Sequence, residues 1–196
     1  QSTQPKEGEY NWTNADKIAD FARQNGIKLR GHCLIWHNQI GRWMFYDENK
    51  NLVSKEVLFE RMRKHIHTVV NRYKDVIYCW DVVNEAMTDD DKAENPYRES
   101  LLYKIAGDEF IAKAFEYAHE ADPKAILFYN DYNAANPGKR DRIYNMVKKM
   151  QDAGVPITGI GMQGHYNIYE PSNEDIDAAI KKYAKLVKNV QFTELD

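Results

Sequence analysis

The sequence predicts an α/β fold, a (β/α)8 barrel of which this chain holds only a part. Three observations predict it. Short apolar runs alternate five times with stretches of helical period, reactive side chains follow each apolar run, and no glycine-rich phosphate loop follows the first run. The alternation implies parallel strands with right-handed crossovers, because only a crossover returns the chain to start another parallel strand.

The elements can be located by their apolar patterns. The apolar runs predict strands at residues 27–29, 76–80, 125–129, 157–162 and 190–193. Between them, apolar residues recur at three- and four-residue steps, as on one face of a helix. These helix faces are Leu58, Met62, Ile66, Val69 and Tyr73; Phe110, Ile111, Ala114, Phe115 and Ala118; Ile143, Met146, Val147 and Met150; and Ile176, Ala179, Ile180, Tyr183 and Val187.

The predicted helices also have start and stop signals. Ser54 and Ser172 are suitable N-caps, Asp122-Pro123 ends the second of these helices, and Gly154 ends the third. An earlier helix, from about residue 14 to residue 25, stops at Gly26.

The position of the reactive side chains favours a barrel over a doubly wound sheet. A barrel gathers the carboxyl ends of all its strands around one pocket, whereas a doubly wound sheet concentrates its site at one switch point. Here reactive residues follow every predicted strand: His32, Trp36 and His37; Asn84 and Glu85; Asn130 and Asp131; Gln163 and His165; Glu194 and Asp196.

The number of strands is too small for a closed barrel. Five strand–helix units and one preceding helix are visible in 196 residues, while a complete barrel usually needs about 250 residues. We expect residues 1–196 to form one partial domain that holds strands three to seven, with two strands before residue 1 and one after Asp196. An open sheet leaves two unpaired edges, so this segment alone should fold poorly.

Composition excludes several classes of partner. A formal net charge of −3 and scattered basic residues provide no field for a nucleic-acid backbone. No apolar run approaches the roughly 20 residues that span a bilayer, and the first ten residues lack the layout of a signal peptide. Two cysteines, Cys33 and Cys79, are too few for a disulfide framework and are expected in neighbouring strands.

Two glutamates stand out by their position. Glu85 lies in WDVVNEA, at the polar end of an otherwise apolar strand, and Glu194 follows the last strand in FTELD. Cleavage of an acetal between two sugars needs a proton donor for the leaving oxygen and a second carboxylate at the anomeric carbon. Two carboxylates on different strands of one barrel mouth meet that need. The alternative for each is a surface acid paired with a nearby cation.

Histidines and aromatic residues surround the expected site. His32 and His165 could orient the carboxylates or bind sugar hydroxyls; the alternatives are core histidines and a zinc site. His32 and His37 should point to opposite faces of a strand, which argues against one shared metal. Flat rings with polar edges suit pyranose rings, and we expect several near the mouth: Trp36, Trp43, Tyr132, Tyr166 and Tyr169. Trp80, inside an apolar run, is expected to pack in the core.

Five strings together resemble glycoside hydrolase family 10, the retaining xylanases. They occur in the family's order and cover essentially the whole chain: LRGHCLIWHNQ, WDVVNEA, LFYNDYN, GIGMQGHY and FTELD. The resemblance implies a (β/α)8 barrel and makes residues 1–196 a partial glycoside hydrolase catalytic domain. It also implies that the chemistry needs no cofactor and no metal.

The resemblance implies a role for each matching residue. Glu85 would be the acid/base and Glu194 the nucleophile that forms the covalent glycosyl-enzyme. Asn84 would bind the 2-hydroxyl of the sugar being cleaved, a contact that strengthens in the transition state. His165 would lie between Glu194 and Asp196 and keep the nucleophile oriented and ionised.

The remaining matches would bind substrate. His32 and Trp36 match residues that line the subsite of the cleaved sugar, and Gln39 matches one that reaches the neighbouring sugar. Gln163 would support these residues. Tyr132, with Asn133, would lie on the acceptor side. The implied substrate-binding set is therefore His32, Trp36, Gln39, Asn84, Tyr132, Gln163 and His165.

The implied reaction is endo-acting hydrolysis of internal β-1,4-xylosidic bonds with retained configuration. The partners would be xylan and xylooligosaccharides, with a carbohydrate-binding module as an inserted or appended neighbour. A polymeric substrate calls for a secreted, periplasmic or cell-surface enzyme. The alternatives are a related β-1,4-glucanase, a non-catalytic sugar-binding fragment and a metal-dependent barrel hydrolase.

Overall fold

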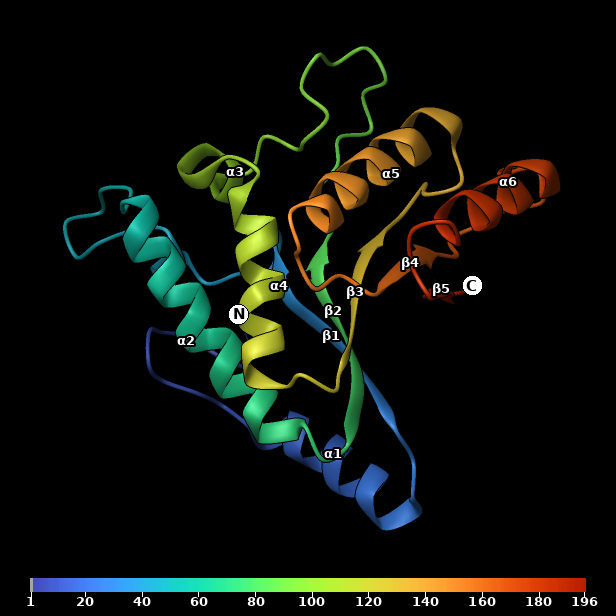
Figure 1. Ribbon diagram of the computed structural model, residues 1–196. Coiled ribbons are helices and arrows are strands. Elements are labelled where there is room, and N and C mark those ends of the chain that lie inside the picture. The colour runs from blue at the N-terminus through green and yellow to red at the C-terminus, as the bar shows by residue number, and fades with distance from the viewer. Residues whose placement is uncertain (1) are drawn as a thin grey trace.

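Parallel strands alternate with helices in a computed structural model that describes residues 2–196 (Figure 1). The described helices and strands, in chain order, are α1 (Thr13–Asn25), β1 (Leu29–Trp36), the 3-10 turn η1 (Arg42–Met44), α2 (Lys55–Tyr73), β2 (Ile77–Asn84), α3 (Leu101–Ala106), α4 (Glu109–Ala121), β3 (Ile126–Asp131), α5 (Pro137–Asp152), β4 (Gly159–Gln163), α6 (Asn173–Tyr183) and β5 (Asn189–Thr193).

The sheet keeps the strands in chain order. Its five strands run β1-β2-β3-β4-β5, and every neighbouring pair is parallel. In the described residues β1 and β5 are therefore edge strands, and the sheet is an open part of a barrel wall. The prediction of an incomplete (β/α)8 barrel with about five strand–helix units is confirmed.

The helices begin and end where their signals predicted. Ser54 and Ser172 cap α2 and α6 by accepting hydrogen bonds from the backbone N–H groups of Val57 and Asp175, at 3.4 and 3.1 Å. Gly26 ends α1 with a φ of 65°, a left-handed conformation that glycine adopts without steric cost.

The core lies between one face of the sheet and the helices α2, α4 and α5 (Figure 1). The predicted apolar faces of these helices are buried throughout, which confirms them. In α6 the burial is less complete, with Ala179 and Tyr183 buried and Ile176 and Ile180 only partly so. The predicted packing role of Trp80 is also confirmed, because its side chain is 3% exposed and lies against Gly31.

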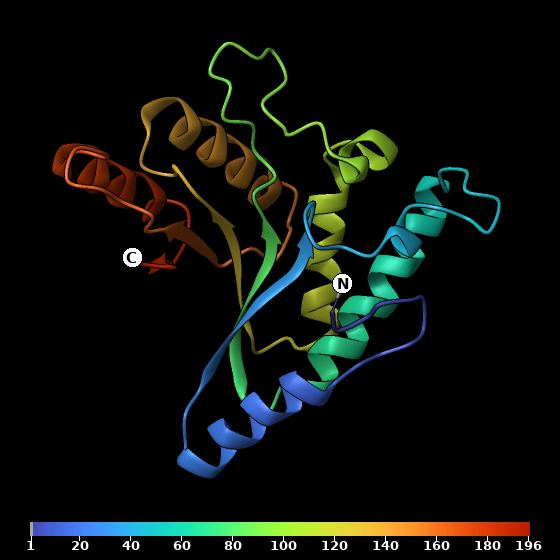
Figure 2. The ribbon, with the colours of Figure 1, turned by 180° about the vertical axis from the view of Figure 1, so that it is seen from behind.

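The opposite face of the sheet, which is turned toward the viewer in Figure 2, carries a group of polar side chains. Arg30 of β1 pairs with Asp81 of β2 and donates to Gln191 of β5 at 2.8 Å. Its guanidinium also lies 4.2 Å from the centroid of the Phe128 ring of β3. These side chains from four strands converge on the face that a closed barrel would turn inward.

The bounds of the first strand were predicted wrongly. The apolar run indicated residues 27–29, whereas β1 extends over Leu29–Trp36. Arg30 and His32 interrupt the apolar pattern, but both find a partner in Asp81, so the strand continues through them. The short helix α3 was not predicted, because its six residues are too few for a helical period to appear.

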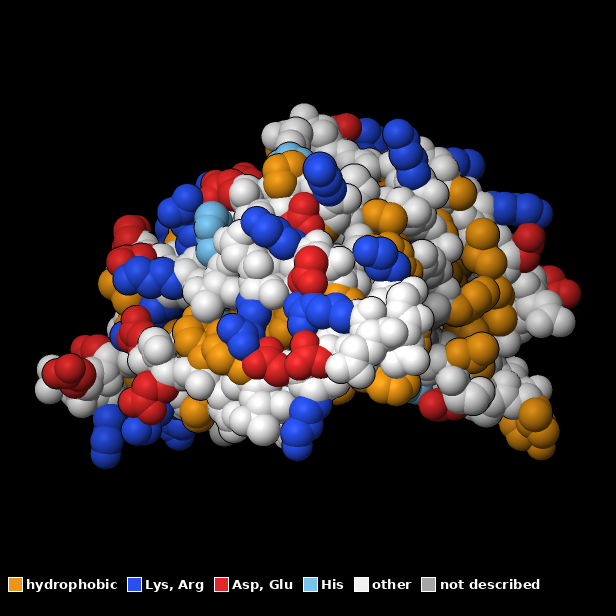
Figure 3. Space-filling view, turned by 90° about the horizontal axis from the view of Figure 1, so that it is seen from below, with side chains coloured by type: hydrophobic (Ala, Val, Ile, Leu, Met, Phe, Trp, Pro, Cys, Tyr) orange, Lys and Arg blue, Asp and Glu red, His pale blue; other side chains and the backbone are white. Residues whose placement is uncertain are grey.

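Apolar side chains also reach the surface. In the view from below, hydrophobic side chains gather along one side of the molecule among scattered charges (Figure 3). The exposed large apolar side chains include Ile18 and Phe21 of α1, and Phe192 and Leu195 near the C-terminus. Within residues 2–196, no helix combines the length and the hydropathy of a membrane span.

Candidate active site

The two predicted glutamates occupy equivalent positions in the sheet. Glu85 directly follows β2 and Glu194 directly follows β5. Both have a positive φ, 56° and 54°, a conformation that few residues other than glycine adopt. Such strained residues concentrate at functional sites, where the surroundings hold them in place.

Three side chains hold the carboxylate of Glu85. Trp36 donates from its indole nitrogen to Oε2 at 2.9 Å, and Gln163 and Asn84 each donate to Oε1 at 3.1 Å. These partners come from β1, β4 and β2, so three strand ends fix one carboxyl group. Gln163 and Asn84 are 3% and 2% exposed, which limits their freedom to move away.

The carboxylate of Glu194 has a different set of partners. Asn130 donates to Oε1 at 2.9 Å, and His165 Nε2 lies 3.2 Å from Oε2. His32 Nδ1 lies 3.9 Å from Oε1. About one third of the Glu194 side chain, 34%, remains exposed, so this carboxylate is both held and accessible.

The two glutamates share one hydrogen-bond network. Asn130 Nδ2, which contacts Glu194, also donates to Asn84 Oδ1 at 2.9 Å, and Asn84 donates to Glu85. Thr193 in turn donates to Asn130 Oδ1 at 2.6 Å. No role was predicted for Asn130, and its place after the apolar run of LFYNDYN is the only signal for it in the sequence.

His165 lies between two carboxylates, as predicted. Its Nδ1 is 2.7 Å from Asp196 Oδ2, and its Nε2 contacts Glu194. The hydrogen bond to Asp196, and then that to Glu194, raise the pKa of His165 above its usual value. A protonated imidazole donates from both nitrogens, so a protonated His165 can bridge the two acids.

His32 is connected to the polar face of the sheet. Its Nδ1 lies 3.0 Å from Asp81 Oδ2, and this contact raises the pKa of His32. Asp81 is 1% exposed and also pairs with Arg30. Asp81 and Arg30 were not predicted as part of the site. A charged residue within an apolar strand is the signal that could have found them, since buried charges require partners.

Tyr132 lies apart from this network. Its hydroxyl donates to Asp89 and accepts from Arg98 Nη2 at 2.8 Å, and its ring lies 3.7 Å from Lys139 Nζ. Asn133 also reaches Asp89, at 3.5 Å. The polar edge of the Tyr132 ring is therefore occupied by protein groups, and no contact joins it to either glutamate carboxylate.

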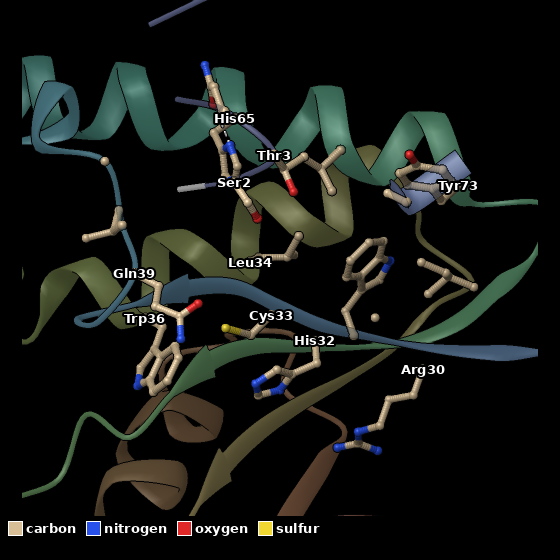
Figure 4. A pocket seen from close by; sticks show the side chains of 18 of the residues that line it. Ser2, Thr3, Arg30, His32, Cys33, Leu34, Trp36, Gln39, His65 and Tyr73 are labelled. Carbon is tan, nitrogen blue, oxygen red and sulfur yellow. Dashed lines mark hydrogen bonds between the residues drawn. The ribbon is translucent and has the colours of Figure 1, made fainter. Parts of the chain in front are cut away.

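A pocket of about 340 Å³ runs along β1 (Figure 4). His32, Trp36 and Gln39 line it together with parts of α1, α2 and the segment that precedes α1. Neither glutamate lines it, so His32 and Trp36 are the residues that connect the pocket to the carboxylates. Gln39 has a φ of 54° and bonds to neither glutamate.

The other predicted residues have varied settings. Trp43 donates to the backbone oxygen of Gln4 at 2.9 Å, and Tyr166 lies edge-on to Phe192. Tyr169 is 83% exposed. His37 packs edge-on against Trp36, and its Nδ1 is buried without a hydrogen-bond partner.

Cys33 and Cys79 lie in the neighbouring strands β1 and β2, as predicted, and both are free thiols. Across residues 2–196, no three or more histidine, cysteine or acidic side chains are grouped as they would be to hold a metal ion.

The chain is similar to several proteins that are named endo-1,4-beta-xylanases. It is 58% identical to a Xylanibacter ruminicola protein named endo-1,4-beta-xylanase/feruloyl esterase, over 98% of this chain and 28% of that protein. A solved psychrophilic glycoside hydrolase family 10 endo-beta-1,4-xylanase superposes with a TM-score of 0.96 at 62% identity, over 98% of this chain and 62% of that one. The intracellular xylanase TsXylA of Thermoanaerobacterium saccharolyticum, solved as a mutant with xylotriose, has a TM-score of 0.93 at 44% identity, over 100% of this chain and 61% of that one.

The chain thus spans between 28% and 62% of the length of these three proteins. The family model that matches is that of glycosyl hydrolase family 10, and the match covers residues 1–196. The resemblance found in the sequence is confirmed over the whole chain, and the chain belongs to glycosyl hydrolase family 10.

Proposed function

We propose that the protein hydrolyses internal β-1,4-xylosidic bonds of xylan with retained anomeric configuration, using Glu85 as acid/base and Glu194 as nucleophile. The observation that carries the proposal is the shared network of the two glutamates. Asn84 and Asn130 connect the carboxylates across the ends of β2, β3 and β5, so both acids belong to one site.

The partners of Glu194 suit a nucleophile. Asn130 and His165 donate to its two oxygens, and His32 lies close by. These contacts hold the carboxylate in one orientation, from which it would attack the anomeric carbon. Asp196 supports this arrangement by binding the far side of the His165 ring.

The partners of Glu85 suit an acid/base. Trp36, Asn84 and Gln163 hold the carboxyl group from three strands. A retaining glycosidase uses this group first to protonate the leaving oxygen and then to deprotonate water. A fixed position serves both steps, because proton transfer needs a heavy-atom distance of about 2.6–3.2 Å.

The substrate would contact the side chains around this network. We propose that His32, Trp36, Asn84, Gln163 and His165 line the subsite of the cleaved sugar. Gln39, in the pocket along β1, would bind the neighbouring sugar. Tyr132 would contact the sugar on the acceptor side with its ring, since its hydroxyl is already hydrogen-bonded to Asp89 and Arg98. Xylooligosaccharides as ligands are supported by the relative TsXylA, which was solved with xylotriose.

We further propose that the protein acts outside the cytoplasm, because xylan is too large to enter a cell. The named relative TsXylA is described as intracellular, so the location of this protein needs a direct test. Comparing xylanase activity in the culture medium with that in washed cells tests the proposal, which fails if the activity stays in the cytoplasmic fraction. An inserted or appended carbohydrate-binding module stays a prediction.

The activity itself is tested with the full polypeptide that carries this sequence. Incubation with xylan should release reducing ends, and products from an aryl β-xylobioside should keep the β configuration in an NMR time course. Glu85→Gln and Glu194→Gln should each lower the rate on xylan by a factor of about 10² or more. Lys148→Gln, at an exposed ion pair of α5, is the control and should retain full activity.

Four outcomes would decide against the proposal. Faster hydrolysis of an aryl cellobioside than of the xylobioside would make the protein a β-1,4-glucanase. Calorimetric binding of xylooligosaccharides without turnover would make it a sugar-binding protein. An activity that chelators abolish, or one that survives both glutamate substitutions, would indicate a different mechanism.

A further inference from the structure

The backbone around Glu85 is held on both sides. Its own N–H donates to the backbone oxygen of Asn130 at 2.9 Å, and its carbonyl accepts from Arg98 Nε at 3.0 Å. The next two N–H groups, of Ala86 and Met87, both donate to the hydroxyl of Tyr129, at 3.0 and 3.1 Å. Because Glu85 has a positive φ, the turn that aims its side chain depends on such contacts.

The hydroxyl of Tyr129 uses all of its hydrogen-bonding capacity. It accepts from the two N–H groups and donates to Asp131 Oδ2, and a hydroxyl offers one donor and two acceptor positions. Tyr129 lies on β3, next to β2, and its side chain is 0% exposed. Burial, reinforced by Asp131, raises the pKa of Tyr129 well above its usual value, so the hydroxyl keeps its proton.

A buried ion pair supports Tyr129 from behind. Asp131 is fully buried, and Lys139 of α5, itself 2% exposed, places Nζ 2.8 Å from Asp131 Oδ1. Lys139 also lies 2.7 Å from Asp89 Oδ1. Because buried charges are costly unless they are paired, the Lys139 ammonium compensates the charge of Asp131, while Oδ2 accepts from Tyr129.

The contacts form a closed ring. Asp89 binds Tyr132 and Arg98, and Arg98 returns to the carbonyl of Glu85. The ring therefore begins at the N–H groups after Glu85 and ends at the carbonyl of Glu85 itself. None of its side chains hydrogen-bonds to the Glu85 carboxylate, so the ring contacts Glu85 only at its backbone.

We propose that Tyr129, supported by Asp131 and Lys139, is a positioning residue for Glu85. It fixes the turn that follows β2 and thereby sets where the Glu85 carboxyl group lies between Trp36 and Gln163. This inference rests on the proposed acid/base role of Glu85. A displacement of the order of 1 Å at a reacting group can lower a rate by roughly 10²-fold, so small backbone shifts have large effects.

The test compares Tyr129→Phe with the unchanged protein on two aryl β-xylobiosides, one with a poor and one with an activated leaving group. Only the poor leaving group needs a proton from Glu85. We expect kcat/KM to fall about tenfold on the substrate with the poor leaving group and less than about threefold on the activated substrate. The tenfold loss is a part of the full contribution that a general acid makes to the rate. Azide should restore kcat on the activated substrate, because it attacks the glycosyl-enzyme without a general base.

The matched control is Tyr183→Phe. Tyr183, on α6, is also a buried tyrosine, 0% exposed, and its hydroxyl donates to the backbone oxygen of Ala134 at 2.7 Å. It should change neither kcat/KM nor the response to azide. If Tyr129→Phe does not fold, Asp131→Asn should give the same leaving-group dependence in a weaker form, since its amide still accepts from Tyr129.

The outcomes separate this inference from the proposed function. Equal losses on both aryl substrates, or no loss, would overturn the positioning role while leaving the acid/base role of Glu85 intact. If the unchanged protein hydrolysed neither substrate, the proposed function would fail, and the positioning role would be decided by crystal structures. An unmoved Glu85 carboxylate in Tyr129→Phe, still bonded to Trp36 and Gln163, would overturn it; loss of either bond would support it.

Discussion

Asn130 binds Glu194 through its side-chain amide, with Nδ2 at 2.9 Å from Oε1. The backbone oxygen of the same residue accepts from the N–H of Glu85, also at 2.9 Å. One residue at the end of β3 therefore holds one glutamate by its side chain and the other by its main chain. The distance between the two carboxyl groups depends on this residue, which is 0% exposed.

Replacement of Asn130 should damage both stability and activity. Asn130→Ala removes the partner of Thr193, Asn84 and Glu194 at once. Buried groups left without partners cost about 1–3 kcal/mol each, so we expect the free energy of unfolding to fall by about 2–4 kcal/mol. Urea unfolding measures the stability, and reducing-end release from xylan measures the activity, which should fall more than about tenfold.

Asn189→Ala is the control for this change. Asn189 is an amide of β5 that donates to the backbone oxygen of Thr158 at 3.2 Å, away from the glutamates. It should cost less than about 1 kcal/mol and leave activity unchanged. An Asn130→Ala protein with normal activity would show that the network does not set the positions of the acids.

The pKa of His165 provides a second prediction. Because the hydrogen bond to Asp196 is the largest cause of its raised pKa, Asp196→Asn should lower the pKa of His165. NMR titration of the imidazole nitrogens measures the change directly. Glu120→Gln, which removes the exposed partner of His67, is the control and should leave the titration of His165 unchanged.

The sign of the effect on stability follows from linkage. A histidine whose pKa is raised by folding stabilises the folded state fully below its unfolded-state pKa of about 6.5, and this stabilisation is lost as the pH rises through the higher folded-state pKa. The difference in Tm between the unchanged protein and Asp196→Asn should therefore be largest at mildly acid pH and shrink as the pH rises. A difference that grew with pH would contradict this account.

Periodicity and strand-end position were sufficient to predict much of the molecule. The buried faces of α2, α4 and α5 follow from apolar spacing alone, because a helix buries one side. The gathering of Glu85, Glu194 and His165 follows from parallel topology, which brings the carboxyl ends of the strands to one edge.

The parts that could not be predicted are those in which polar groups satisfy each other across strands. Arg30 and Asp81 lie 51 positions apart, so neither the continuation of β1 through Arg30 nor the partner of His32 was visible locally. The same holds for Tyr132, because its hydroxyl is occupied by Asp89 and Arg98 from a loop that has no periodicity. Which polar side chains meet in such pairs depends on the register between neighbouring strands, and composition does not encode this register.

The pair of Arg30 and Asp81 should be important for stability. Removing one partner of a buried ion pair leaves an uncompensated charge, so Asp81→Ala should lower the free energy of unfolding by about 3–5 kcal/mol. The double variant Arg30→Met with Asp81→Ala should recover part of this loss, because no isolated charge remains. Urea unfolding of the two single variants and the double variant measures the coupling.

The exposed pair of Lys148 and Asp152 is the control for this cycle. Asp152→Ala should change stability by less than about 1 kcal/mol, because solvent already screens these charges. If Asp81→Ala were equally mild, the polar face of the sheet would have to be hydrated well enough to accept an unpaired Arg30. The pKa of His32 should fall in Asp81→Ala, since the hydrogen bond to Asp81 is the largest cause of its raised value.

The close contact of Gly31 with Trp80 connects the core to the site. A β-carbon on Gly31 would lie 2.1 Å from the Trp80 ring, so Gly31→Ala forces the buried indole or the strand to move. Overpacking of this kind costs about 1–3 kcal/mol. Since β1 continues from Gly31 to His32 and Trp36, we expect lower activity on xylan and a changed near-UV circular dichroism spectrum together with the lower Tm.

Gly154→Ala is the control for this change. A β-carbon there would lie in open space, but the φ of 79° is strained for alanine, so the variant should cost about 1 kcal/mol and change neither activity nor the spectrum. Equal behaviour of the two variants would show that the indole yields without disturbing β1.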